Sequence, residues 1–179
     1  MKTTLRLKAV LFLVFACMFT SAAFAQMTTA PKKAPKVVAS PRDSVSFVIN
    51  GATITINYGS PSVRDRQVWG KLVPYDTVWR TGANEATRFT STKDILVAGK
   101  VLPAGTYGFF AIPGKNSWAI IFNSVDKQWG AFKYDASKDV LRVGAIPEKT
   151  NKHERLLYTI DANGINLIWD EVKIPVSIK

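Results

Sequence analysis

The residues best suited to chemistry gather in one stretch of the chain, residues 59–87. It is roughly twenty residues longer than an ordinary connection between strands, and long ordered loops in compact domains are usually functional. The candidate ligand-binding residues in it are Arg64, Arg66, Trp69, Tyr75, Trp79, Arg80, Asn84 and Glu85. The arginines can offer forked guanidinium donors to a carboxylate or phosphate, and the tryptophans can stack on a flat ligand or a sugar. Glu85 can act as an acid or a base.

The same residues admit a structural interpretation. Arg80 and Glu85 flank a Gly-Ala-Asn turn, where they can form a hydrogen-bonded brace that ties the loop to a sheet. Tryptophans within a loop often cap the edge of a core. The sequence leaves the brace and the binding site as alternatives.

Ordinary catalytic groups are scarce. The chain has one Cys and one His, which excludes a Cys/His zinc site and a disulfide framework. His153 lies in the charged segment 149–155, which we interpret as a solvated turn with no apolar wall to tune an imidazole. No phosphate-binding glycine loop or dinucleotide fingerprint occurs. We therefore assign no catalytic residue, no metal ligand and no cofactor, although a calcium site of carboxylates and carbonyls stays open.

Much of the formal charge of +11 lies in the first 39 residues. Three cations precede an apolar run over residues 9–19, and Ala-Phe-Ala at 23–25 is the small-x-small pattern that a signal peptidase recognises. We predict a signal peptide over residues 1–25 and an exported product, periplasmic or extracellular. The apolar run is about half the length of a bilayer span, and no later segment qualifies as a transmembrane span.

Residues 26–39 read as a flexible Pro/Ala/Lys tether, which leaves 40–179 as a single domain. Without the cations of residues 1–39, that domain carries about +5, and for an exported protein this gives little reason to expect a nucleic-acid partner. Cys17 follows a stretch that loosely resembles a lipoprotein signal. The bulky Phe15 favours cleavage after residue 25 over a lipid anchor at Cys17.

From residue 44 onward hydrophobic residues recur with a period of two. Asn50-Gly51 separates two such runs and predicts a hairpin, because both central residues of that turn need positive φ. Further β-rich runs cover residues 94–98, 105–113, 117–123, 139–146, 156–161, 165–170 and 172–178. With turns about every ten residues, we predict an all-β fold, an antiparallel β-sandwich of about nine strands with one long ordered loop. Greek-key and jelly-roll order remain alternatives, and short helical pieces are expected only near 65–72 and 135–138.

Two of these runs, 106–112 and 118–122, carry apolar side chains on both faces. One face builds the core, so the other is covered by a loop or exposed as an apolar platform. We expect the 59–79 connection to cover it, with an aromatic ligand groove as the alternative.

Several motifs together resemble a known family. They are Trp-Arg-Thr-Gly-Ala-Asn-Glu-Ala-Thr at 79–87, Leu-Pro-Ala-Gly-Thr-Tyr at 102–107, Ile-Pro-Gly at 112–114 and Gln-Trp-Gly at 128–130. With them, the chain from about residue 40 to its C-terminus resembles the family catalogued as domain of unknown function 2911. The resemblance implies a secreted or envelope protein of Bacteroidota-like bacteria. It implies no particular activity, substrate or catalytic residue.

The sequence thus favours binding over catalysis. We expect a non-catalytic module that binds a small molecule or a glycan at the 59–87 loop. A hydrolase of envelope glycans or polymers that uses Glu85 is one alternative. A structural or assembly module that contacts an envelope protein partner is another.

Overall fold

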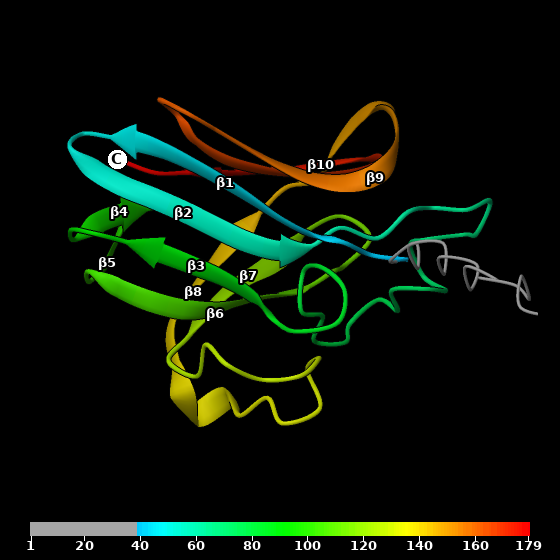
Figure 1. The fold of residues 1–179 in the computed structure, drawn as a ribbon, viewed down its shortest axis with the longest axis horizontal. Helices are drawn as coiled ribbons and strands as arrows, with labels where there is room; N and C mark the ends of the chain where they lie inside the picture. Colours follow the sequence, from blue (N-terminus) through cyan, green and yellow to red (C-terminus); the bar gives the residue numbers. More distant parts are fainter. Residues whose placement is uncertain (1–38) are drawn as a thin grey trace, which may run out of the picture. The chain divides into compact units, whose positions relative to one another are not determined.

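The computed structural model describes residues 39–179, so the predicted signal peptide, Cys17 and nearly all of the predicted tether lie outside the described residues. The described part is almost entirely antiparallel β structure (Figure 1), which confirms the predicted all-β fold. Nowhere in this range does a helix reach the length and apolar character that crossing a bilayer requires. The elements are β1 Arg42–Ile49, β2 Ala52–Gly59, β3 Thr87–Ser91, β4 Ile95–Val97, β5 Lys100–Leu102, β6 Gly105–Ile112, β7 Trp118–Asn123, the 3-10 helix η1 Ala136–Lys138, β8 Asp139–Ala145, β9 Glu148–Asp161 and β10 Gly164–Ser177.

The larger layer is a six-stranded sheet in the order β1-β2-β3-β6-β7-β8. Its first hairpin turns at Asn50 and Gly51, whose φ angles of 49° and 78° confirm the predicted turn. In the inner strands alternate residues point to one buried face, among them Ile54, Phe89 and Phe122, each less than 1 % exposed. The period of two in the sequence therefore sets the core side of this sheet.

The second layer is built from the β9–β10 pair and the short β4–β5 pair. The two pairs meet through the end of the chain, because the backbones of Leu96 and Lys179 exchange two hydrogen bonds of 2.8 and 2.9 Å. The second layer contributes buried side chains to the common core, among them Leu156, Trp169 and Ile174, each at most 1 % exposed. The molecule is thus a sandwich whose core lies between the layers.

β10 joins the run predicted at 165–170 and all but the last residue of the run predicted at 172–178 into one bent strand. Asp170 has a φ of 54°, and the pairing with β9 shifts register on both sides of it. The two ends of β10 consequently lie close together, since Ile178 N donates to Asn163 O at 3.0 Å. A Cβ on Gly164 would lie 2.2 Å from Val176 O, so only glycine fits there.

Some local expectations need correction. Residues 65–72 form turns rather than a helix, whereas η1 lies within the predicted 135–138 piece. The segment 149–155 is part of β9 rather than a solvated turn, and His153 pairs in register with Asp170. β3 and β5, strands of five and three residues, were not predicted.

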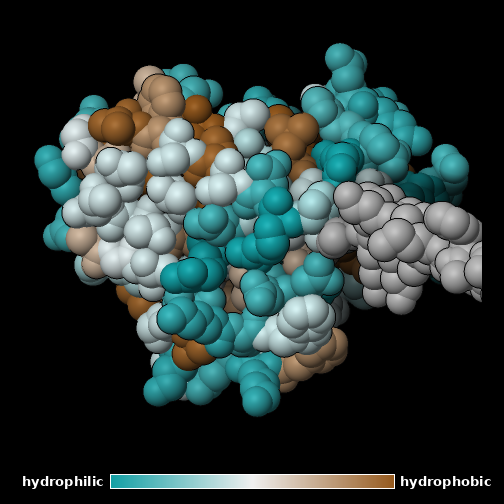
Figure 2. All heavy atoms as spheres, viewed as in Figure 1, coloured by the Kyte–Doolittle hydropathy of each residue, from teal (hydrophilic) through white to brown (hydrophobic). Residues whose placement is uncertain are grey.

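The second apolar face of β6 and β7 is covered from two sides. Phe110 and Ile121 pack there against Val78, from the 59–79 connection as expected, and against Ala131 and Tyr134. The last two belong to the segment 124–138, drawn yellow-green at the bottom of Figure 1. Towards β1 the same outer face is polar: Ser46, Thr55, Thr90 and Thr106 face one another in register across four strands. Figure 2 shows mainly white and teal residues over β2, β3 and β6.

Candidate functional site

The loop between β2 and β3 is ordered because its backbone forms hydrogen bonds with the strands around it. Val63 N donates to Glu154 O of β9 at 2.7 Å, and Trp79 exchanges two backbone hydrogen bonds with Ala111 of β6. Near its end, Glu85 forms a β-bridge with Trp129. Satisfied backbone groups of this kind hold a long loop in one conformation.

The turn that follows Arg80 is anchored by a buried threonine. Thr81 is fully buried with a φ of 51°. Its carbonyl accepts hydrogen bonds from the Tyr158 hydroxyl at 2.7 Å and from the Thr87 hydroxyl at 3.1 Å, and its own hydroxyl donates to Phe109 O at 2.9 Å. Burial raises the pKa of Tyr158 far above its ordinary value, so this phenol stays a donor.

Of the two tryptophans of the loop, Trp79 is buried in the core and Trp69 is partly buried against it. Trp69 and Trp79 join Trp118 and Trp169 in a cluster with ring centroids 5.0 to 6.2 Å apart, mostly edge to face. Trp79 is only 8 % exposed. The cluster therefore attaches the loop to the core, and Trp79 also lines a pocket.

That pocket, here called the arginine pocket, has a volume of about 250 Å³. Its charged lining residues are Arg66 and Arg80, with no carboxylate among them. The uncharged lining residues are Ser40, Pro61, Leu72, Val73, Trp79, Gly82, Ala83, Asn84 and Trp169. Two guanidiniums against apolar walls favour an anionic ligand and do not suit a metal ion.

Arg80 is the unusual group of the arginine pocket. Its Nε is buried without a hydrogen-bond partner in the described residues, and no ion pair formed there involves it. Burial lowers the pKa of its guanidinium, because the charge has lost water and no carboxylate replaces it. A partly buried cation without a counter-ion is costly for folding alone.

The other arginines of the loop differ in their surroundings. Arg66 lines the pocket while its Nε and Nη2 donate to the carbonyls of Val63 and Ser62 at 2.9 and 2.6 Å. Arg64 is exposed, and its Nη2 reaches Ala39 O at 3.2 Å outside the pocket. Tyr75 also lies apart from the pocket and packs against Gly70.

Asn84 and Glu85 are neighbours in the chain and face different hollows. Asn84 lines the arginine pocket and donates to Ser40 O at 3.2 Å. Glu85 forms an ion pair of 3.4 Å with Arg42, so the described structure contains no Arg80–Glu85 brace. The turn is held instead by the hydrogen bonds of Thr81.

Glu85 belongs to a second hollow, here called the Trp129 groove, with a volume of about 410 Å³. It also contains the ion pair between Arg88 Nε and Asp126 Oδ2 at 2.9 Å. Its lining residues are Arg42, Glu85, Ala86, Arg88, Asp126, Lys127, Gln128 and Trp129. Sequence reasoning missed most of them, and the available signal was an isolated Trp among polar residues and a glycine at 126–130.

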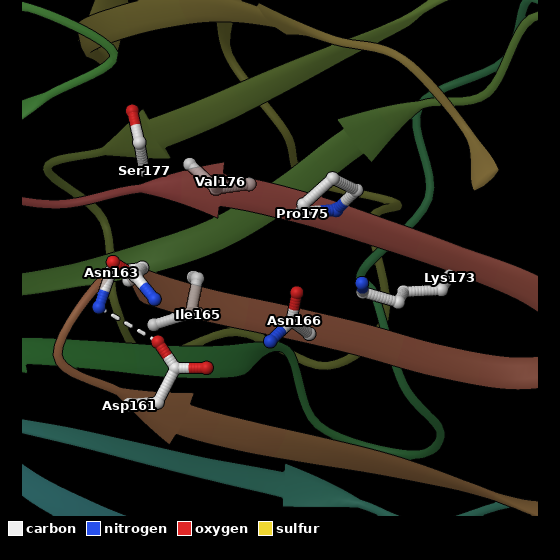
Figure 3. A pocket seen from close by; sticks show the side chains of 9 residues that line it. Asp161, Asn163, Ile165, Asn166, Lys173, Pro175, Val176 and Ser177 are labelled. Atoms are coloured by element: carbon white, nitrogen blue, oxygen red, sulfur yellow. Dashed lines mark hydrogen bonds between the residues drawn. The ribbon is translucent and has the colours of Figure 1, made fainter.

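A third hollow of about 260 Å³ lies between the two ends of β10 (Figure 3). Its polar groups serve the hairpin itself: Asp161 accepts a hydrogen bond from Asn163 N at 2.7 Å, and Lys173 pairs with Glu148 at 2.8 Å. We assign this hollow no function.

The motif at the turn and the pockets on either side of it can be compared with known proteins. Residues 40–178 match the family described as protein of unknown function, DUF2911. The chain belongs to this family. Comparison with curated proteins and with solved structures finds no significant match. The DUF2911 match spans both layers of the sandwich, the arginine pocket and the Trp129 groove.

Proposed function

We propose that this DUF2911 protein is an exported binding module that takes a small anionic ligand, a carboxylate or a phosphate, in the arginine pocket. The observation that carries the proposal is Arg80, a partly buried guanidinium whose Nε has no hydrogen-bond partner and which pairs with no carboxylate among the described residues. A bound anion would supply the missing counter-charge. The pocket is small, just below the usual range of roughly 300–1,000 Å³, which suits a compact ligand.

Binding rather than catalysis fits the groups that line the pocket. Arginine stays charged at any ordinary pH, so it holds an anion but does not exchange protons with it. Within the described residues, the lining contains neither a nucleophile with an adjacent base nor a carboxylate. Asn84 adds one neutral polar group that can orient the ligand.

The test compares Arg80→Gln with Arg64→Gln, which removes the same charge from the same loop outside the pocket. Inorganic phosphate, sulfate, succinate and citrate are titrated by calorimetry at low ionic strength. We expect at least one anion to bind wild type and Arg64→Gln alike, and Arg80→Gln to bind it about tenfold or more weakly. Equal weakening in both variants, or none in Arg80→Gln, would contradict the site.

The same variant has a second expected property. Without ligand, Arg80→Gln should have a melting temperature equal to or above that of wild type, because an uncompensated charge leaves a partly buried position. If Arg80→Gln fails to fold, Arg66→Gln and Arg80→Lys replace it in the titration. Arg80→Lys keeps the charge but loses the fork, so weaker binding in that folded variant still tests the pocket.

Export rests on the sequence of residues 1–25, with its basic start, apolar run and Ala-Phe-Ala site. We propose that the mature chain begins at Gln26 and reaches the periplasm or the medium. Mass spectrometry of the N-terminus of the protein from its native cells measures this. A mature chain that begins at an acylated Cys17 would replace it with a lipid-anchored product.

A further inference from the structure

The Trp129 groove is separate from the arginine pocket and is built from different residues. Trp129 is 63 % exposed, whereas the other four tryptophans of the chain form the core cluster. Its backbone is nevertheless fixed: Ala86 N donates to Gln128 O and Gly130 N to Asn84 O, both at 2.9 Å, on either side of the bridge to Glu85. A large indole is therefore held out to solvent by an ordered backbone.

The polar groups around the indole come as two ion pairs, Arg42–Glu85 and Arg88–Asp126. Each pair engages one carboxylate oxygen, so the second oxygen and further guanidinium N–H groups remain for a ligand. In addition, Oε1 of Gln128 is buried with no hydrogen-bond partner in the described residues. The groove thus offers donors and acceptors side by side.

The formal charge of the groove is nearly balanced, with Arg42, Arg88 and Lys127 against Glu85 and Asp126. Carboxylates on two sides disfavour a phosphate or a nucleic acid, and the ion pairs disfavour a purely apolar ligand. A neutral sugar suits a groove with balanced charge, both donors and acceptors, and an exposed indole. Its hydroxyl groups donate and accept at once, and the C–H face of a pyranose packs flat on an indole.

We propose that the Trp129 groove binds a neutral oligosaccharide, with Trp129 as the stacking surface and the two ion pairs as the hydroxyl-binding groups. At about 410 Å³ the groove lies within the usual range for small ligands, roughly 300–1,000 Å³. The backbone beside it is close-fitting: a Cβ on Gly108 would lie 2.4 Å from Val125 O, so this glycine lets the backbone of Val125 pack against β6.

Fluorescence can report this site, since Trp129 is 63 % exposed whereas three of the other tryptophans are buried and Trp69 is partly buried against them. The probes are cellohexaose, xylohexaose, mannohexaose and chitohexaose. We expect at least one to shift the emission of wild type to the blue and to protect it from acrylamide quenching, with saturation. Failure of all four to bind at millimolar concentration would overturn the proposal.

Calorimetry with the same hexasaccharide then compares the variants, because Trp129→Ala lacks the fluorescent reporter. Trp129→Ala should bind about tenfold or more weakly, as for loss of a central aromatic contact, and Glu85→Gln should bind more weakly than wild type. The matched control is Phe132→Ala, an 86 % exposed aromatic of the same segment that does not line the groove. Unchanged affinity in Trp129→Ala, or an equal loss in Phe132→Ala, would overturn the proposal.

Arg80→Gln separates this inference from the proposed function. That variant should keep oligosaccharide binding while it loses the anion, because Arg80 does not line the Trp129 groove. Loss of both ligands in Arg80→Gln would mean that the two hollows are one site, and would overturn a separate neutral-sugar groove.

Discussion

At the scale of single residues, the position of the turn at 80–87 depends on glycines that leave no room for a side chain. A Cβ on Gly59 would lie 2.1 Å from Ala83 O, and one on Gly82 would lie 2.8 Å from the Thr87 hydroxyl. Ala83 N also donates to Gly59 O at 3.1 Å. The end of β2 and the turn are therefore in backbone contact, and this contact places Asn84 and Glu85.

Gly59→Ala should lower the free energy of unfolding by about 3 kcal/mol, because the neighbour that must move is backbone. Urea denaturation measures this. Gly144→Ala is the matched control: nothing lies within 4 Å of its Cβ position, so its stability should change by less than about 0.5 kcal/mol. Similar stabilities for the two variants would mean that the turn is not packed against β2.

At the scale of elements, the segment 124–138 both covers the second apolar face and presents Trp129. It is tied to β7 by Asn123, which is fully buried. The Asn123 amide donates to Asp135 O at 2.9 Å and to Asp139 Oδ1 at 2.7 Å, and its oxygen accepts from Val125 N at 2.9 Å. One side chain thus holds both ends of the segment.

Asn123→Ala should cost about 2 kcal/mol, since it removes three part-buried hydrogen bonds made by one buried side chain. The loss should concentrate in one place, with faster amide hydrogen exchange over 124–138 than over β2. Ser124→Ala, which removes an exposed hydrogen bond to Lys138 O, should change little. Uniformly faster exchange across the chain in Asn123→Ala would contradict a local tie.

At the scale of the whole molecule, two tyrosines join the layers. Tyr58 of β2 and Tyr158 of β9 pack edge to face at 4.7 Å, and the Tyr58 hydroxyl donates to Asp43 Oδ2 at 3.0 Å. Burial, together with Asp43, raises the pKa of Tyr58 to about 12, and burial also raises the pKa of Tyr158. The junction of the sandwich therefore depends on neutral phenols.

The unfolded chain, with tyrosine pKa values near 10, releases these protons before the folded protein does. The contribution of Tyr58 to stability is thus complete below pH 10 and lost as pH rises to about 12, by about 2 to 3 kcal/mol. Urea denaturation from pH 8 to 12 should show this fall, and Tyr58→Phe should make it shallower. An equally steep fall in Tyr58→Phe would rule out this phenol as the source.

The fold was largely readable from the sequence because its signals are local. Alternation decides which side chains of a strand face the core, and Asn50-Gly51 favours its turn through two neighbouring residues. The site was readable only in part. Arg66, Arg80 and Asn84 do share a pocket, but Trp69 lies in the core cluster, and Arg64 and Tyr75 lie elsewhere.

The sequence by itself determined the all-β class and the first hairpin, and it singled out residues 59–87 as the stretch for a candidate site. Only the tertiary structure decided that Asn84 and Glu85 face two hollows, and that Trp129, more than forty residues further on, stands beside Glu85. The reason is physical. The alternation of hydrophobic and polar residues along a strand decides which side of the sheet each side chain faces. Which segment covers that side is decided by packing between distant parts of the chain.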